Sequence, residues 1–85
     1  MLTNEQILER DNAIYGLLML RMEKGKIELT EKAKAIKSRI DSLDKELTDS
    51  LFNMDSNNRW IYRNAIKMKR NEEIHAFNRE VYESL

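Results

Sequence analysis

The segment LTEKAKAIKSRIDSLDKELTDSLFNM, residues 29–54, contains a heptad pattern that decides the fold. We call its repeating positions the seam, and they are Leu29, Ala33, Ile36, Ile40, Leu43, Leu47, Ser50 and Met54. These positions alternate steps of four and three residues, so they lie along one face of an α-helix. The seam is apolar except at Ser50, and Thr30 is placed to cap the helix. The pattern therefore predicts a helix at about residues 31–54 that packs along this face against a second helix.

Two further helices are predicted, one on each side of this segment. Thr3 and Gln6 have the spacing of a capping box, and Gly25 can adopt the left-handed conformation that ends a helix. The first helix should therefore cover about residues 4–24. The sequence DSNN, residues 55–58, favours a turn before a third helix at about residues 58–83. The predicted core residues of this third helix are Ile61, Tyr62, Ala65, Ile66, Met68, Ile74, Phe77 and Val81, with Leu85 as a further candidate.

The composition indicates a small helical protein. The chain has 85 residues, no proline and only two glycines, and such a chain has few places to turn. A domain of this length buries only about 60% of the surface that its unfolded chain exposes, so its stability as a monomer is small. We predict an all-α fold in a single domain, residues 1–85. It should be a three-helix bundle or a helical hairpin that forms homo-oligomers, with an antiparallel, coiled-coil-like pair made by the second and third helices.

Charged residues are distributed unevenly along the second and third helices. Residues 59–70, RWIYRNAIKMKR, contain five bases and no acid, and residues 41–55 contain one base and five acids, a net charge of 1 − 5 = −4. If the helices run in opposite directions, residues whose numbers sum to roughly 112 lie opposite one another, and the two segments meet. Farther from the turn, Lys32, Lys34, Lys37 and Arg39 would face Glu72, Glu73, Glu80 and Glu83. The charges therefore favour the antiparallel arrangement, because a parallel one would bring like charges together.

The basic stretch has a second interpretation, as a nucleic-acid-binding surface. The residues concerned are Arg59, Trp60, Tyr62, Arg63, Lys67 and Arg70. The four cations fall on one helical face, and aromatic rings beside such a face can stack on the bases of a single strand. The formal net charge of the chain is zero, so no general attraction to nucleic acid is expected. We favour the ion-pair interpretation and keep a nucleic-acid or nucleotide-binding module as the alternative hypothesis.

Residues suited to catalysis or to binding a metal or a cofactor are scarce. The chain has one histidine and no cysteine, which leaves little basis for a Ser-His-Asp set and none for a disulfide or a thiolate metal site. Neither glycine belongs to a phosphate-binding loop. Glu72 and His75 form a Glu-x-x-His pair, but di-iron helical bundles use that pair twice, together with further inward glutamates. We expect no enzyme activity, no catalytic residue, no cofactor and no metal site.

Apolar residues cover most of the circumference of the first helix in its second half. A helix of a three-helix bundle hides only one side, so some of these residues should stay exposed unless another chain covers them. The expected partner-binding residues are Tyr15, Leu17, Leu20 and Met22. We therefore predict a small non-enzymatic helical module that binds a partner protein and regulates, inhibits or chaperones it.

The sequence also suggests where the protein acts. The first eleven residues, MLTNEQILERD, have acids where a signal peptide requires a basic start. The longest apolar run, residues 13–20, is less than half of the roughly 20 residues that span a bilayer. With no cysteine in the chain, we expect a cytoplasmic protein with no membrane partner. The abundance of Asn, Ile and Lys is typical of AT-rich genomes, including those of viruses such as phages.

Overall fold

The computed structural model describes residues 1–53 and 56–85, and this part of the chain forms three helices. Helix α1 spans Asn4–Glu23, α2 spans Glu31–Asn53 and α3 spans Ser56–Ser84. The prediction of an all-α fold with three helices is confirmed. Met54, the last expected seam position, and Asp55 of the expected turn lie outside the described residues.

The helix ends are fixed by local hydrogen bonds that the sequence encodes. The Thr3 backbone N–H donates to Gln6 Oε1 at 2.9 Å, and the Gln6 backbone N–H donates to Thr3 Oγ1 at 3.2 Å, so the capping box forms. At the other end of α1, Gly25 has φ +72°, and the N–H groups of Gly25 and Lys26 donate to the carbonyls of Met22 and Arg21. This is a Schellman motif, in which glycine takes the left-handed position.

The N-terminus of α2 is capped by Thr30, as the sequence predicts. The Ala33 backbone N–H donates to Thr30 Oγ1 at 3.1 Å, which satisfies one of the N–H groups that a helix start leaves open. The same hydroxyl donates to Glu80 Oε1 of α3 at 3.1 Å. The cap therefore also links the start of α2 to the C-terminal part of α3.

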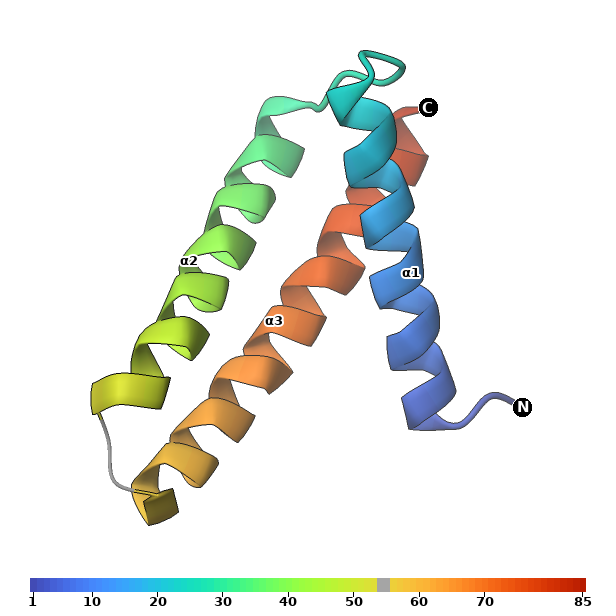
Figure 1. Ribbon diagram of the computed structural model, residues 1–85. Helices are drawn as coiled ribbons and strands as arrows, with labels where there is room; N and C mark the ends of the chain where they lie inside the picture. Colours follow the sequence, from blue (N-terminus) through green and yellow to red (C-terminus); the bar gives the residue numbers. More distant parts are fainter. Residues whose placement is uncertain (54–55) are drawn as a thin grey trace.

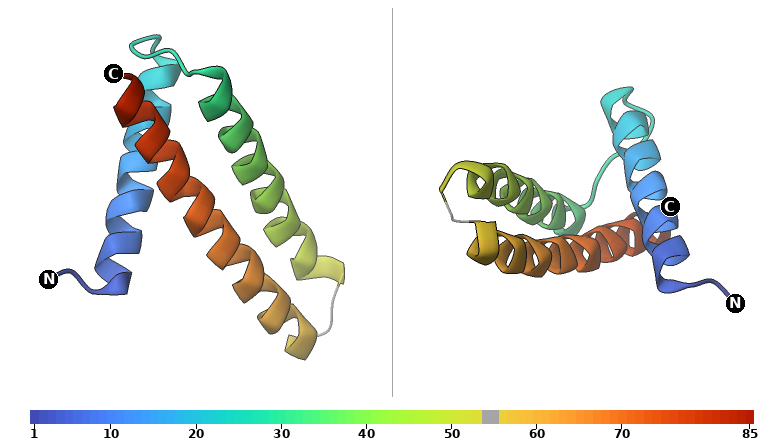
Figure 2. Two further views of the ribbon diagram at one scale, coloured as in Figure 1. Left: turned by 180° about the vertical axis from the view of Figure 1, so that it is seen from behind. Right: turned by 60° about the horizontal axis from the view of Figure 1, so that its bottom comes forward.

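Helices α2 and α3 lie side by side along most of their length (Figure 1). As residue numbers rise along α2, those of its contacts on α3 fall, since Lys32 lies near Glu80 and Asp44 lies near Arg70. The two helices therefore run in opposite directions, and Figure 2 shows the same arrangement from two other sides. The predicted close packing of these two helices is confirmed.

The apolar core lies where all three helices come together. Its buried residues are Leu18 of α1, then Ala33, Ile36 and Ile40 of α2, and Ile74, Phe77 and Val81 of α3. Burial of each large side chain of this kind contributes about 1.5–3 kcal/mol. Within the seam, Leu29, Leu43 and Leu47 are only half-buried, whereas Ser50 is buried. The described seam residues therefore form the packed face of α2, but among them only Ala33, Ile36, Ile40 and Ser50 are fully buried.

Helix α1 packs against the C-terminal part of α3 and leans away from α2 (Figure 2). The Tyr15 ring meets the Phe77 ring edge-on, with the ring centroids 5.1 Å apart and the planes at 76°. From this contact α1 and α3 diverge toward the N-terminus of α1 (Figure 1). A groove lined by Ile7 and Leu8 of α1 and by Met68 and Glu72 of α3 lies between these diverging parts, and we call it the wedge.

Part of the predicted core of α3 is wrong. Ile61, Tyr62, Ala65, Met68 and Leu85 are exposed, whereas Ile66, Ile74, Phe77 and Val81 are buried as predicted. The reason is geometric. Helix α2 covers only one face of α3, and α1 has already diverged from α3 beside the N-terminal half of that helix (Figure 1).

Candidate protein-interaction surface

The four α1 residues expected to bind a partner lie on two different faces of the helix. Tyr15 is half-buried against Phe77, and Met22 is half-buried beside α2. Leu17 and Leu20 are 49% and 47% exposed. Because α1 turns once every 3.6 residues, Leu17 and Leu20 point away from the face that holds Tyr15. The structure therefore leaves Leu17 and Leu20 accessible to a partner, and it places Tyr15 inside the chain's own packing.

Gly16 lies beside Leu17 on the exposed side of α1. A Cβ built at Gly16 would meet no atom within 4 Å, so no other part of the described chain approaches this glycine closely. A glycine inside a helix can mark the close approach of another helix, and the described part of the chain brings none to Gly16.

A second group of exposed apolar side chains includes Ile61 and Met68, which the sequence analysis placed in the core, and Trp60, which it placed only in the nucleic-acid alternative. Trp60, Ile61 and Met68 of α3 are 70%, 63% and 66% exposed, and Leu51 and Phe52 near the end of α2 are exposed as well. Helix α1 has 20 residues and α3 has 29, so α1 is too short to cover α3 from end to end. The difference in length between the first and third helices could have indicated that part of the third helix stays exposed.

The basic stretch is partly engaged in bonds within the chain. The Arg63 guanidinium donates to the Leu47 carbonyl and, at 3.0 Å, to Ser50 Oγ. Ser50 Oγ itself donates to the Leu47 carbonyl at 2.8 Å. The polar break in the seam is therefore a hydrogen-bonding position that receives an arginine from α3.

Arg70 joins all three helices. Its guanidinium Nε donates to the Asp44 carboxylate of α2, and its Nη1 donates to Asn12 Oδ1 of α1 at 3.0 Å. Farther from the turn, Arg39 Nη2 lies 3.1 Å from Glu73 Oε2 and Lys32 Nζ lies 3.8 Å from Glu80 Oε2. Acids and bases therefore meet across α2 and α3 in the middle of the pair and toward the end far from the turn. In each of these pairs the two residue numbers sum to a value close to the expected value of roughly 112.

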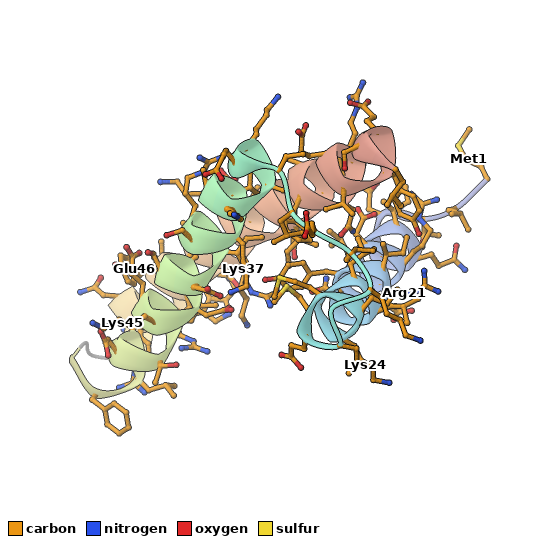
Figure 3. The ribbon with its side chains drawn as sticks, turned by 90° about the horizontal axis from the view of Figure 1, so that it is seen from above. Met1, Arg21, Lys24, Lys37, Lys45 and Glu46 are labelled. Carbon is orange, nitrogen blue, oxygen red and sulfur yellow. The ribbon has the colours of Figure 1, made fainter. Side chains whose placement is uncertain are left out.

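Two lysines of α2 do not take the partners expected on α3. Lys34 Nζ lies 3.3 Å from Glu31 Oε1, and Lys37 Nζ lies 2.7 Å from Asp41 Oδ2, so both pairs are local to α2. Residues three or four apart on a helix are neighbours, and this proximity competes with a partner on α3. Figure 3 shows Lys37 on the side of α2 that faces α1, whereas Lys45 and Glu46 lie farther along α2.

A cavity of about 540 Å³ separates the C-terminal part of α1 from α2. Met22, Ile27 and Leu29 contribute apolar walls, and Lys37 and Asp41 contribute charge. Burial raises the pKa of the nearby Tyr15 hydroxyl above its ordinary value, and the carboxylate of Asp41 adds to the rise. The hydrogen bond to Asp41 raises the pKa of the Lys37 ammonium. Lys37 and Asp41, two charged residues of this lining, therefore pair with each other.

One buried contact between α1 and α3 is polar, and sequence reasoning missed it. Asp11 of α1 is buried, its Oδ2 lies 3.1 Å from His75 Nδ1, and its backbone carbonyl accepts a 2.8 Å hydrogen bond from Asn78 Nδ2. Asp11 lies on the helical face of Ile7, Ile14 and Leu18, at steps of four, three and four, and this pattern could have identified it. No group of three His, Asp or Glu side chains that could hold a metal ion occurs within residues 1–53 and 56–85.

Comparisons with protein-family models, with curated proteins and with solved structures gave no match. Within the described parts of the chain, no helix combines the length and the apolar character needed to cross a bilayer.

Proposed function

We propose that the protein is a small non-enzymatic helical module that binds a partner protein and regulates, inhibits or chaperones it. One observation carries the proposal: large apolar side chains are exposed both on the outer face of α1 and on the N-terminal half of α3. They are Leu17, Leu20, Trp60, Ile61 and Met68. Apolar side chains gathered on the surface of a small protein are typical of interaction sites, and methionine suits a surface that adapts to its partner.

We further propose that α2 and α3 form an antiparallel, coiled-coil-like pair and that the chain forms homo-oligomers in the cytoplasm. The alternating seam and the ion pairs Lys32–Glu80 and Arg39–Glu73 support the pairing. The exposed apolar side chains and the small size of the chain support self-association, because a second copy would cover surface that one copy leaves in water. The lack of cysteine supports a reducing compartment.

The nucleic-acid alternative has less support. Arg63 and Arg70 bond to groups of α1 and α2, so a phosphate would have to replace those bonds. Trp60 and Lys67 are exposed and open to a ligand. A net charge of zero gives no long-range attraction to add to this local surface.

The proposal is tested by comparing wild type with the double variant Leu17→Glu/Leu20→Glu. Immobilised wild-type protein should capture a defined partner from an extract of the native host, and the variant should lose it, because two carboxylates would have to be buried in the interface. Leu85→Glu is the matched control, since Leu85 is an exposed leucine that follows the last residue of α3. Circular dichroism should show equal helix content in all three proteins.

Light scattering during size exclusion tests the oligomer at the same time. A strictly monomeric species at micromolar concentration, together with no difference in capture between wild type and the double variant, would remove the proposed function.

A further inference from the structure

We propose that the wedge between α1 and α3 is a docking groove for a cationic amphipathic helix of the partner protein. This inference rests on the proposed function, and it assigns both a place and a chemistry to the partner. The groove has a volume of about 470 Å³, and its lining includes Ile7, Leu8, Asp11, Met68, Glu72 and His75. It lies where α1 and α3 diverge in Figures 1 and 2.

The walls of the groove are apolar and come from both helices. Leu8 of α1 and Met68 of α3 are exposed, and Ile7 is half-buried. The apolar surface continues out of the groove along α3, because Ile61 precedes Met68 by two helical turns on the same face. An elongated apolar strip of this kind fits the apolar face of a helix better than it fits a compact small molecule.

The floor of the groove is acidic. The Asp11 side chain is only 8% exposed, and it lines the groove together with the exposed carboxylate of Glu72. The groove lining contains no Lys or Arg among the described residues, and Arg10 reaches Asp11 Oδ1 only at 3.9 Å from its half-exposed position. The lining therefore carries two carboxylates, those of Asp11 and Glu72, and Asp11 Oδ2 also lies 3.1 Å from His75 Nδ1. A buried carboxylate attracts a cation more strongly than an exposed one does, because less water screens it.

These features together specify the occupant. A helix that lies along α3 can place apolar side chains, spaced three or four residues apart, against Ile61, Met68 and Leu8. A Lys or Arg one turn farther along that helix would then reach Asp11 and Glu72. Either feature alone is weak, because an exposed ion pair contributes little and apolar contact does not select a sign of charge. Their combination selects a basic amphipathic helix over an acidic one.

The test uses the full chain and two synthetic helical peptides of equal length, one built from Leu, Ala and Lys and the other from Leu, Ala and Glu. Methyl NMR spectra of the labelled protein report the binding site. The Lys peptide should shift the methyl signals of Met68 and Leu8 to saturation, and the Glu peptide should leave them in place. Asp11→Asn and Glu72→Gln should each weaken the binding of the Lys peptide, the first by roughly tenfold. Tyr82→Ser, which changes an exposed apolar residue of α3 outside the groove, is the matched control.

Each result of the peptide titrations either supports the docking groove or overturns it. Glu72→Gln changes an exposed side chain and keeps the test valid if Asp11→Asn alters the helix content. Equal binding of the two peptides, or no shift of Met68 and Leu8 at all, would overturn the groove. Shifts confined to Leu17 and Leu20 would also overturn it while leaving the proposed function in place, because that surface is separate from the wedge.

Discussion

Replacing Tyr15 and Phe77 singly and together tests whether Tyr15 anchors α1 inside the chain. Phe77 is fully buried, and its ring centroid lies 5.1 Å from that of Tyr15. Phe77→Leu removes part of a packed ring and should lower the free energy of unfolding by about 1–3 kcal/mol. The total for a chain of this length is only about 4–13 kcal/mol, so the loss will be easy to detect. An edge-to-face pair contributes about 0.5–1.5 kcal/mol beyond burial, so the two changes together should cost less than the sum of each alone, by that amount.

Urea unfolding followed by circular dichroism measures the four free energies of this cycle. The slope of the free energy of unfolding against urea concentration should be the same in all four proteins, because each variant should unfold from the same compact state. A coupling free energy near zero, with Tyr15→Leu as stable as wild type, would contradict the assignment of Tyr15 to the interior. Tyr15 would then again be a candidate partner-binding residue.

Three further predictions concern charge. The free energy of unfolding should fall above about pH 10, because the folded chain raises the pKa values of Tyr15 and Lys37 and the unfolded chain therefore loses these protons first. In urea titrations at alkaline pH, Tyr15→Phe should remove part of this fall. A pH profile that Tyr15→Phe leaves unchanged would exclude the tyrosine as a cause. Arg70→Met should lower the melting temperature more than Arg79→Met, because Arg70 bonds to α1 and α2 whereas Arg79, among the described residues, pairs with Glu83 one turn along α3. Equal shifts in calorimetry would refute this role. Trp60 fluorescence should not respond to a single-stranded oligonucleotide at low salt, and a saturable response that fades with salt would restore the nucleic-acid hypothesis.

Local signals predicted the helices well. The capping box at Thr3, the left-handed Gly25 and the Thr30 cap each depend on a few neighbouring residues, and each forms as expected. The seam likewise identified which face of α2 packs, because the period of a helix depends only on its own backbone. The pairing of Arg39 with Glu73 followed from the spacing and the charges alone.

Tertiary features were predicted less well. Whether Met68 is buried depends on the angle between α1 and α3, and no residue of α3 encodes that angle by itself. The same angle decides that Tyr15 packs inward while Leu17 stays outside. The buried link between Asp11 and His75 joins residues 64 positions apart, so periodicity could identify Asp11 as unusual but could not name its partner.

Helix α1 and the α2–α3 hairpin should differ in their local stability, because α1 is attached less extensively. Helices α2 and α3 face each other along most of their length, whereas α1 rests on one part of α3 and joins α2 through the residues between Glu23 and Glu31. Amide hydrogens of α1 should therefore exchange with solvent through a local opening that leaves the α2–α3 hairpin intact. Such an opening would expose the Phe77 ring, which packs against Tyr15 of α1, so the locally opened chain would present more apolar surface than the closed one.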